Sequence, residues 1–561
     1  MKKSIRKLTV LSIVLACSSA VAMPAEATPP AAEQVFQPLG TTDSGVQLNQ
    51  TRQYLERQRI AREIAAERQA SVIEGTETTG EKPTGTVRFV LQKIIIPKSD
   101  VLPQAELTAL AKEYEGKEVA IEDLYALVNR INGLYRTRGF VTCRAFLSPQ
   151  TVHAGIVHID LVEGKTGSVE ISGLTTTRPD YIRKRIHLEN GKIQNVKDLN
   201  DELLRFNATN DAQLHIELKA GQEAGTTDYV ITVREPQKQI AGIFSDNAGS
   251  DTSGLYRLGA YWQDRDLTGN RDHLFLSVLR SEGMKAVSSS YNTPINHIGT
   301  RAGLSFTSNS VHITDGYFEP LGVRGHAYAL TAFVTSPIVT SDTRKSQWGF
   351  EYGHQKSKTD YGTSLGLRSH WTDDTIDSLF LYYDQLDFGK STVFYQKHGY
   401  RTGWYTNLND QTRSFGKYET TMLYQKLFRS GQQWTLRLDG QFASTQYLPS
   451  AEMFYLGGMY SVRGYKESLL GGDGGFSASA EYSFPLAKSH SLKGYLFVDG
   501  GRVWGSSAFG DRSLMGTGAG LTRDLNDHMS LNVALAFPLI RTINGEEQGR
   551  TRIHFSFNSA F

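Results

Sequence analysis

Alternation of apolar and polar residues dominates the last three-fifths of this 561-residue chain, from residue 237 to residue 561. Neighbouring side chains would fall on opposite faces, as they do in a β-strand, and Gly, Asn, Asp and Ser separate one segment from the next. One such segment sets Tyr256, Leu258, Ala260 and Trp262 against Arg257, Gly259 and Tyr261. With strands of about 9–11 residues and roughly 20 residues per strand and connection, the stretch predicts about 16 antiparallel strands.

The last ten residues indicate what the two faces meet. Ile553, Phe555, Phe557 and the terminal Phe561 share one face, while the other face carries Arg552, His554, Ser556 and Asn558. A soluble β-sandwich would have to hide that aromatic edge, whereas a membrane barrel turns it to lipid and its polar face to water. After the N-terminal segment no apolar run reaches 18 residues, which excludes a membrane-spanning helix. The fold class that we expect is therefore a membrane β-barrel.

The N-terminus is typical of an export signal. Lys2, Lys3, Arg6 and Lys7 precede an apolar run over residues 8–17, and Ala25-Glu26-Ala27 offers a cleavage site. We expect residues 1–27 to be removed; Ala20-Val21-Ala22 is an alternative site, and the lipoprotein-like Leu15-Ala16-Cys17 fits its pattern poorly. Removal leaves Cys143 alone, so we expect no intrachain disulfide and a buried, hydrophobic role for this thiol.

Between the signal and the barrel the sequence predicts an extension and two small α+β domains. Residues 46–70 favour a helix with charges on every side, which suits either a solvated linker or a polar, water-filled lumen. This helix belongs to an extension over residues 28–70, and a linker rich in Gly, Thr and Pro follows at 71–86. Residues 87–165 show the order strand, helix, helix, strand, strand, and residues 166–236 repeat it.

In the first of these domains Ile121, Leu124, Val128, Ile131 and Tyr135 recur at helical spacing, and Gly139 is placed to end the helix. Neither domain carries His, Cys or paired acids at catalytic or metal-ligand spacing. They are typical of binding modules, and we expect neither an enzyme nor a bound cofactor or metal.

Charge and short motifs exclude further classes. The chain has 60 Lys and Arg against 58 Asp and Glu, so no general basic field indicates nucleic acid. Gly362-Thr363-Ser364-Leu365-Gly366 matches a nucleophile elbow but lies in a strand region without a following helix, which argues against a lipase. Gly389-Lys390-Ser391-Thr392 lacks the first glycine of a phosphate loop, and the glycines of 516–520 lack a βαβ unit.

Several stretches resemble one known family. They are "YRTRGFVTCRAFLSPQTVHAGIVHIDLVEG" at 135–164, "FSDNAGSDTSGLYRLGAYWQDRDLTGNRD" at 244–272, the V-R-G-[FY] motif Val462-Arg463-Gly464-Tyr465, and the F-x-D-x-G motif Phe497-Val498-Asp499-Gly500-Gly501. The layout is similar to the outer-membrane translocators of two-partner secretion, the haemolysin secretion/activation (TpsB) family. The first stretch resembles the end of that family's first polypeptide-transport-associated (POTRA) domain. The resemblance covers essentially the mature chain.

The alternation in residues 491–501 places Asp499 on the face of Lys493, Tyr495 and Phe497, opposite Leu496, and so in the lumen. The resemblance implies that the loop carrying Arg463 folds back into the barrel and that Arg463 contacts Asp499. Val462, Arg463, Gly464, Tyr465, Phe497, Asp499 and Gly501 are therefore the candidate loop-to-wall residues. An arginine can hold a carboxylate with two directed hydrogen bonds, whereas a lysine would keep the charge and lose that geometry.

As for function, the resemblance implies export of one large secreted partner with an N-terminal secretion domain, from the periplasm to the cell surface. The two POTRA domains would recognise the partner in the periplasm by sheet augmentation. The helix at 46–70 would plug the resting pore of a barrel embedded in outer-membrane lipid. Phe561 is the expected C-terminal signal for the barrel assembly machinery. We expect a monomer that hydrolyses no nucleotide and binds no nucleic acid.

Two other classes remain open on the sequence alone. A factor that assembles other outer-membrane barrels shares the Arg and Asp motifs, but it usually has more POTRA domains and lacks the plug helix. A nutrient channel would not need two periplasmic α+β modules. Loss of many outer-membrane proteins on gene deletion would favour the first, and solute uptake in liposomes without a secretion defect would favour the second.

Overall fold

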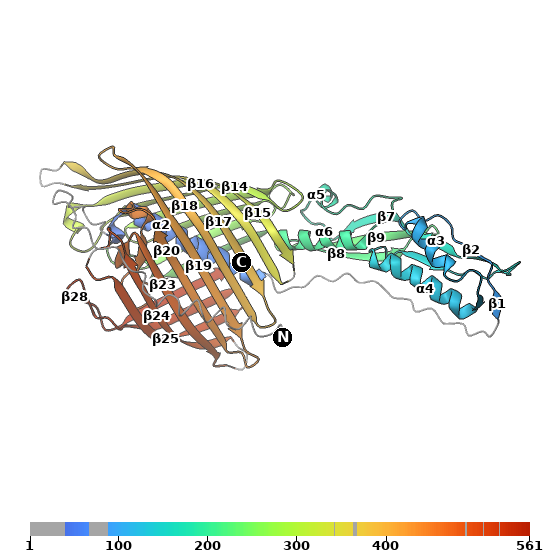
Figure 1. Ribbon diagram of the computed structural model, residues 1–561. Helices are drawn as coiled ribbons and strands as arrows, with labels where there is room; N and C mark the ends of the chain where they lie inside the picture. Colours follow the sequence, from blue (N-terminus) through green and yellow to red (C-terminus); the bar gives the residue numbers. More distant parts are fainter. Residues whose placement is uncertain are drawn as a thin grey trace. The chain divides into compact units, whose positions relative to one another are not determined.

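The computed structural model describes residues 40–66, 88–341, 343–362, 367–487, 491–508, 510–526 and 528–561 (Figure 1). The predicted signal peptide at 1–27, the linker at 71–86 and the serine of the elbow-like motif, Ser364, lie outside the described residues.

A closed barrel of sixteen antiparallel strands forms most of the described chain, as the alternation predicts. The last strand pairs with the first, and Ser245 lies opposite Phe557 in that closing ladder. The wall strands are β10 (Gln239–Asp246), β11 (Arg257–Asp264), β12 (His273–Arg280), β13 (Met284–Pro294), β14 (Arg301–His312), β15 (Arg324–Ser341), β16 (Arg344–Gly362), β17 (Arg368–Phe388), β18 (Thr392–Thr406), β19 (Thr412–Leu427), β20 (Gln433–Ala443), β23 (Gly474–Pro485), β24 (Leu492–Trp504), β25 (Ser513–Asn526), β26 (Met529–Pro538) and β29 (Arg552–Ala560). Because the strand number is even, β10 begins and β29 ends at the same end of the barrel, which we call the proximal end.

The connections at the opposite, distal end carry short elements of their own. These are η3 (Glu319–Leu321), η4 (Ser450–Glu452), the ladder of β21 (Phe454–Leu456) with β22 (Leu470–Gly472), and the ladder of β27 (Thr542–Ile543) with β28 (Glu546–Glu547).

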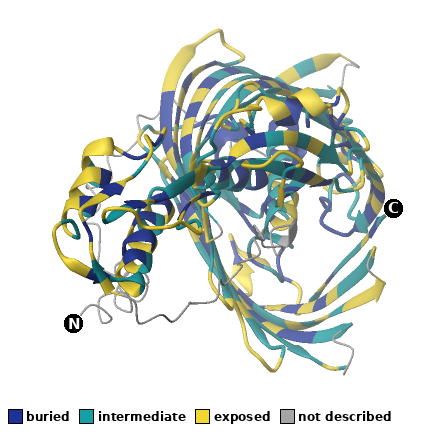
Figure 2. Ribbon diagram, turned by 90° about the vertical axis from the view of Figure 1, so that its right-hand side faces the viewer, coloured by how far each residue is buried: buried dark blue, intermediate teal, exposed yellow. Residues whose placement is uncertain are grey.

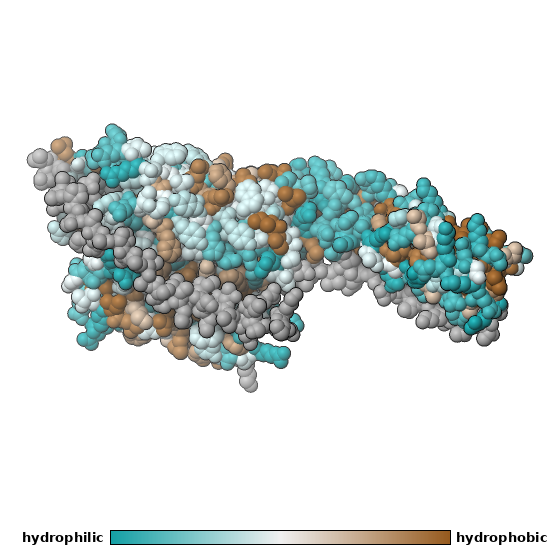
Figure 3. All heavy atoms as spheres, in the orientation of Figure 1, coloured by the Kyte–Doolittle hydropathy of each residue, from teal (hydrophilic) through white to brown (hydrophobic). Residues whose placement is uncertain are grey.

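The two faces of the wall separate as the sequence predicts. Leu258 and Ile553 are exposed on the outer face, and Arg257 and His554 are buried on the inner face. Figure 2 shows the wall as a ring around other segments, with buried and exposed residues alternating along its strands. Hydrophobic side chains lie on the outer face of the barrel in Figure 3. Because water-filled barrels turn apolar residues outward, this pattern suits a bilayer around the wall.

The first α+β unit precedes the barrel. Its elements are β1 (Arg88–Val90), β2 (Lys93–Ile95), α3 (Gln104–Lys112), β3 (Glu118–Ala120), α4 (Ile121–Thr137), β4 (Cys143–Phe146), β5 (Ile156–His158) and β6 (Asp160–Glu163). The predicted apolar face of α4 is confirmed, since Leu124, Ile131 and Tyr135 lie in one core cluster. The Asp123 carboxylate accepts a hydrogen bond from the Ala120 amide at 2.9 Å and caps the start of α4. Gly139, with φ 89°, follows its end.

The second α+β unit also combines strands with two helices, but it has fewer strands than the first. It contains β7 (Lys165–Ser172), α5 (Pro179–Arg183), α6 (Val196–Thr209), β8 (Gln213–Ala220) and β9 (Thr226–Arg234). The strands form one sheet in the order β7-β9-β8, with β7 parallel to β9 and β8 antiparallel to it. Leu199, Leu203 and Phe206 of α6 pack into its core. Strand β10 follows β9 within five residues, which brings this unit to the proximal end of the barrel.

Helix α2 (Ser44–Ala66) lies inside the barrel, after the short η2 (Gly40–Thr42). Near its start the Ser44 hydroxyl lies 3.1 Å from that of Ser357, toward the distal end of β16. Near its end Ile60 packs with Leu386 and Tyr395, at the proximal ends of β17 and β18. The helix therefore runs along the lumen for about 34 Å, given 1.5 Å per residue. The expected range was 46–70; the helix begins two residues earlier, and residues 67–70 are not among those described.

No helix within the described ranges combines the length and the hydropathy that crossing a bilayer requires.

Cys143 gives a test of the first α+β unit. Its side chain is buried, and burial, together with the nearby charge of Glu163, raises the pKa of the thiol to about 11. At pH 8 the folded protein lacking residues 1–27 should therefore resist iodoacetamide, since the thiolate is the reactive form. In urea the same thiol should react at the rate of a free cysteine, as mass spectrometry can follow. Rapid labelling of the folded protein would contradict the packing described.

Candidate functional site

Residues 444–473, which connect β20 to β23, fold back into the lumen, and we call them the inner loop. The loop has a hydrophobic core of its own rather than a solvated surface: Val462, Tyr465 and Leu470 are buried together with Val503 and Leu514 of the wall. The ladder of β21 with β22 closes the base of the loop. The loop is therefore a packed part of the barrel interior.

Arg463 binds Asp499 of β24 through three hydrogen bonds. Its Nε lies 2.7 Å from Oδ2 and its Nη2 lies 2.9 Å from Oδ1, so the guanidinium meets the carboxylate side-on with both oxygens engaged. The Arg463 backbone amide donates to the same Oδ2 at 3.1 Å. Asp499 is fully buried, so water cannot replace these donors. Such a charge-assisted fork is both strong and directional.

Three neighbours complete the surroundings of the Arg463 guanidinium. Its Nη1 donates to Glu481 Oε2 at 3.1 Å, and its centre lies 3.5 Å from the centroid of the Phe497 ring. Ser479, which lies opposite Asp499 in the β23–β24 ladder, donates from its hydroxyl to Asp499 Oδ1 at 2.7 Å. One cation thus holds two acids and one aromatic ring on adjacent strands.

Glycines let the inner loop approach the wall. Gly464 has φ 100°, a conformation that favours glycine. A Cβ on Gly516 of β25 would lie 2.1 Å from the Arg463 carbonyl oxygen, so only glycine fits at that wall position. A Cβ on Gly501 would lie 2.7 Å from a methyl group of Leu456. The Tyr465 hydroxyl donates to the carbonyl oxygens of Met515 and Ile540 at 2.7 and 2.9 Å.

The structure thus gathers seven of the eight candidate residues in one region. The eighth, Phe561, lies at the proximal end, where its backbone amide donates to the carbonyl of Ala241 at 2.7 Å and its side chain is exposed. Glu481, Ser479 and His554 also belong to the region and were not singled out from the sequence; His554 Nε2 accepts from the Gly464 amide at 3.3 Å. Strand alternation places all three on the inner face, but their meeting with the loop depends on the strand register.

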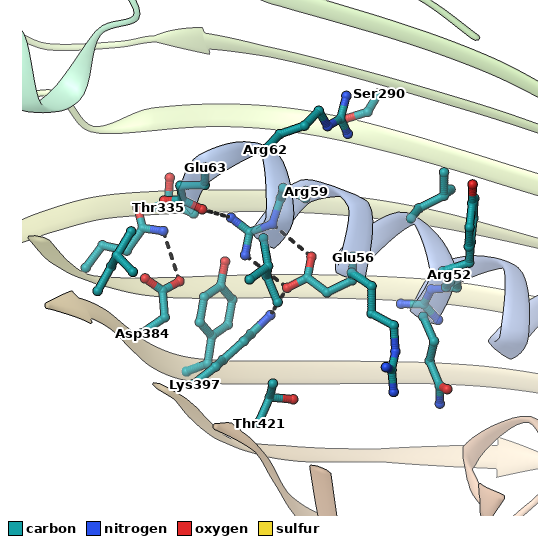
Figure 4. Close-up of a pocket in the computed structure, with 18 of the residues that line it drawn as sticks. Arg52, Glu56, Arg59, Arg62, Glu63, Ser290, Thr335, Asp384, Lys397 and Thr421 are labelled. Atoms are coloured by element: carbon teal, nitrogen blue, oxygen red, sulfur yellow. Dashed lines mark hydrogen bonds and ion pairs between the residues drawn. The ribbon is translucent and has the colours of Figure 1, made fainter. Parts of the chain in front are cut away.

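Charged side chains hold the C-terminal half of α2 in place (Figure 4). Glu56 binds Arg59 of the same helix at 2.9 Å and Lys397 of β18 at 3.0 Å. Arg59 also binds Glu63 at 2.9 Å, again within the helix. Elsewhere Arg57 reaches Asp439 of β20 at 3.0 Å. A helix with charges on every side is stable here because the wall supplies partners around it.

The N-terminal half of α2 contacts the inner loop. Asn49 donates to the carbonyl oxygen of Ala451 at 2.8 Å, and Gln50 donates to the Ser468 hydroxyl at 2.6 Å. The Tyr54 ring packs against Tyr460, with ring centroids 5.7 Å apart. The helix and the loop therefore fill the lumen as one contacting unit.

A second charged cluster ties the start of the inner loop to the wall. Glu452 of η4 binds Lys417 of β19 at 2.7 Å, and Lys417 also binds Glu419 at 3.1 Å. Arg401 of β18 binds Glu419 at 3.1 Å. All four side chains face the lumen, so the start of the loop has a polar attachment in addition to that of Arg463.

A cavity of about 1890 Å³ remains in the lumen, between α2 and the wall. Charged residues of both line it, including Arg59, Asp384 and Lys397. Apolar side chains such as Ile60 and Leu386 line it as well, and α2 and the inner loop both border this space. A polypeptide could pass through a barrel of this size only after one or both had moved.

Two of the short motifs lie in the wall of the barrel. Gly389-Lys390-Ser391-Thr392 forms the turn from β17 into β18, and the glycines of 516–520 lie within β25. Among the described residues no group of three His, Cys, Asp or Glu side chains is arranged to hold a metal.

Comparison with protein families gives two matches. Residues 225–523, more than half of the chain, match the model of the haemolysin secretion/activation protein ShlB/FhaC/HecB. Residues 89–164 match the ShlB-type POTRA domain and cover the first α+β unit.

Individual proteins are similar over most of the chain. The heme/hemopexin transporter protein HuxB of Haemophilus influenzae is 26% identical over 470 residues, covering 79% of this chain and 82% of its own. The outer membrane transporter CdiB of Dickeya dadantii is 23% identical over 478 residues, covering 80% and 83%. The solved structure of CdiB from Escherichia coli superposes with a TM-score of 0.66 at 19% identity, covering 93% of this chain and 99% of that one, which shows a shared fold.

Replacing Arg463 should destabilise the barrel interior. Arg463→Ala leaves Asp499 buried with only the Ser479 hydroxyl and the backbone amide, and breaking a buried ion pair in this way costs about 3–5 kcal/mol. The thermal transition of the folded barrel, followed by its mobility in semi-native gel electrophoresis, should shift down by several degrees. Lys466→Ala is the matched control, since Lys466 is an exposed cation of the same loop. Equal shifts in the two variants would contradict a buried, structural pair.

Neutralising Glu56 should loosen α2. Glu56→Gln removes the ion pair to Lys397 of the wall, whereas Glu63→Gln removes only an ion pair within the helix. A pair worth about 1 kcal/mol corresponds to roughly a five-fold change in the fraction of open channels. Planar bilayer recordings should therefore show more frequent opening for Glu56→Gln than for Glu63→Gln. Identical recordings would mean that this contact does not hold the helix.

Proposed function

Because this chain belongs to the haemolysin secretion/activation family, we propose that it exports one large partner protein from the periplasm to the cell surface through its barrel. The protein lies in the outer membrane, with its α+β units in the periplasm at the proximal end of the barrel. The partner would be a secreted protein that carries an N-terminal secretion domain.

The observation that carries the proposal is a wide barrel closed by parts that do not belong to its wall. Barrels of sixteen strands enclose an aqueous channel. Here α2 and the inner loop narrow that channel, and side-chain hydrogen bonds, ion pairs and small apolar contacts hold α2 in place. The helix can leave without breaking any pairing between wall strands, so opening costs these contacts and not the barrel.

The α+β units are the proposed receptor for the partner. We take residues 87–165 and 166–236 as two POTRA domains, 28–70 as the extension with the plug helix, and 237–561 as the barrel. In the sheet of the second unit, β7 and β8 each pair only with β9 among the described strands, and residues 191–193 bond the start of β7, so β8 and the rest of β7 offer the open edges. An extended segment of the partner can add to such an edge through backbone hydrogen bonds.

Transport in this proposal needs no reaction catalysed by this chain. Neither nucleotide nor cofactor takes part, and folding of the partner outside the cell would prevent its return. The chain would act as a monomer, inserted by the barrel assembly machinery that reads the C-terminal Phe561. The Arg463 fork would keep the inner loop in register with the wall while the partner passes.

Deletion of the gene tests the proposal. The expected result is the loss of one large species from the surface or the culture medium, detected by proteomics, with other outer-membrane proteins unchanged. Expression of the wild-type chain should restore that species, and Arg463→Ala should restore folded barrel with impaired export. General depletion of outer-membrane barrels would instead favour an assembly factor. Normal secretion together with lost solute uptake would favour a nutrient channel.

A further inference from the structure

A second cavity, of about 480 Å³, lies at the proximal end between the second α+β unit and two turns of the barrel. We call it the rim pocket. Arg178, Lys184 and Arg185 line it from the α+β unit, and Asn270, Ile295 and His297 line it from the turns. The two sides meet directly, because the Arg178 amide donates to the carbonyl of Gly269 at 2.9 Å.

The same joint contains a fully buried cation, Arg271, in the first of these turns. Its Nη1 lies 3.3 Å from Asp266 Oδ2, and its Nε donates to Asp211 of the α+β unit at 2.9 Å. Two acids thus neutralise Arg271 on the inner side of the joint. The cations of the rim pocket, unlike Arg271, have no acidic partners.

Positive charge in the rim pocket is poorly compensated. The Arg185 guanidinium donates to the carbonyl oxygens of Tyr181 and Asn296 at 3.1 and 2.8 Å, and it lies 3.6 Å from the centroid of the Tyr181 ring. All of these partners are neutral, and burial lowers the pKa of Arg185.

No other charged residue of the rim pocket offsets the positive charge of Arg185. Arg178 and Lys184 form no ion pair within the described ranges, and the one acid of the pocket, Asp180, binds Arg183 at 3.3 Å instead. Arg178 and Lys184 are exposed and Arg185 is half-buried, so the pocket presents three cations against one acid that is itself paired.

The rim pocket opens where the apolar band of the barrel ends. Along the outer face of β13, Val287 is exposed, and the outward positions that follow toward the proximal end include Tyr291 and Thr293. Tyr291 lies opposite Leu304 of β14, which is 56% exposed. Thr293, one outward position further, already lines the pocket. A tyrosine at this level is typical of the boundary between acyl chains and head groups.

Exposed apolar side chains flank the pocket on the barrel turns. Ile295 is 57% exposed, Leu267 is 47% exposed and Ile298 is 37% exposed. In water such residues on turn tips would gain nothing, whereas beside a bilayer they can contact the glycerol and the first methylene groups of a lipid. Cations next to apolar residues match a lipid whose anionic head group lies above its acyl chains.

We propose that the rim pocket binds the phosphate of an anionic phospholipid in the periplasmic leaflet of the outer membrane. Arg178, Lys184 and Arg185 contact the phosphate, and Ile295 and Ile298 contact the glycerol end of the lipid. A free phosphate would use the same cations but not the apolar turns. The bound lipid would join the α+β unit to the barrel turns and so fix the unit against the membrane surface.

Titration calorimetry of the full chain in detergent tests this proposal, with short-chain phosphatidylglycerol as the probe. The triple variant R178Q/K184Q/R185Q should bind it about 100-fold more weakly, given the contribution of each cation near an anionic head group. The control K192Q/K197Q/K219Q removes three exposed cations of the same unit that do not line the rim pocket, and should bind as the wild type does. Equal loss in both variants would overturn a specific site and indicate general charge attraction.

Two further arms separate lipid from free phosphate. Inorganic phosphate at the same concentration should not displace the phosphatidylglycerol, and displacement would overturn the assignment to a lipid. The variant I295S/I298S keeps every cation and should also bind phosphatidylglycerol more weakly, with inorganic phosphate binding unchanged. Gel mobility of the folded barrel checks that each variant folds. Full binding by the folded triple variant would refute the proposal. Because the readout is lipid binding, its failure is distinguishable from a failure of secretion.

Discussion

The fork between Arg463 and Asp499 is the contact on which the closed interior depends. Asp499 is fully buried, and a buried carboxylate is stable only with donors directed at it. Arg463 supplies three of these donors and also binds Glu481, so one side chain on the inner loop satisfies acids on two wall strands. Packing of Val462 and Tyr465 on either side then keeps the arginine from leaving. The loop position follows from this local chemistry.

Helix α2 is held in a different manner. Its ion pairs with Lys397 and Asp439 and its amide contacts with the inner loop are individually modest, and several are partly exposed to the lumen. Contacts of this kind exchange readily with water, so their loss costs little beside that of a buried fork. The interior thus combines a loop held by a buried fork with a helix whose C-terminal half is held by partly exposed pairs. That difference suits a pore that must stay closed at rest and yet open for a protein.

Much of the architecture could be predicted from local pattern. Period-two alternation predicted the barrel, its strand number and the face of Asp499, because side-chain direction along a strand depends only on residue parity. Helical spacing predicted the buried face of α4. The start of α2 was less well predicted, since a helix without an apolar face carries no periodic signal and Asp43 caps its start through the Gly45 amide. The pairing of Arg463 with Asp499 was inferred from family resemblance rather than from the residues themselves.

By itself the sequence determined the alternating wall, the two α+β units, the polar helix and the glycines that permit close approach. Only the tertiary structure decided which partners meet: Glu481 and His554 at the inner loop, Lys397 beneath α2, and the cations of the rim pocket beside exposed turns. The physical reason is that side-chain direction and helix propensity act over a few residues. Contacts between residues far apart in the chain depend on strand register and on the path of each loop, which no single segment encodes.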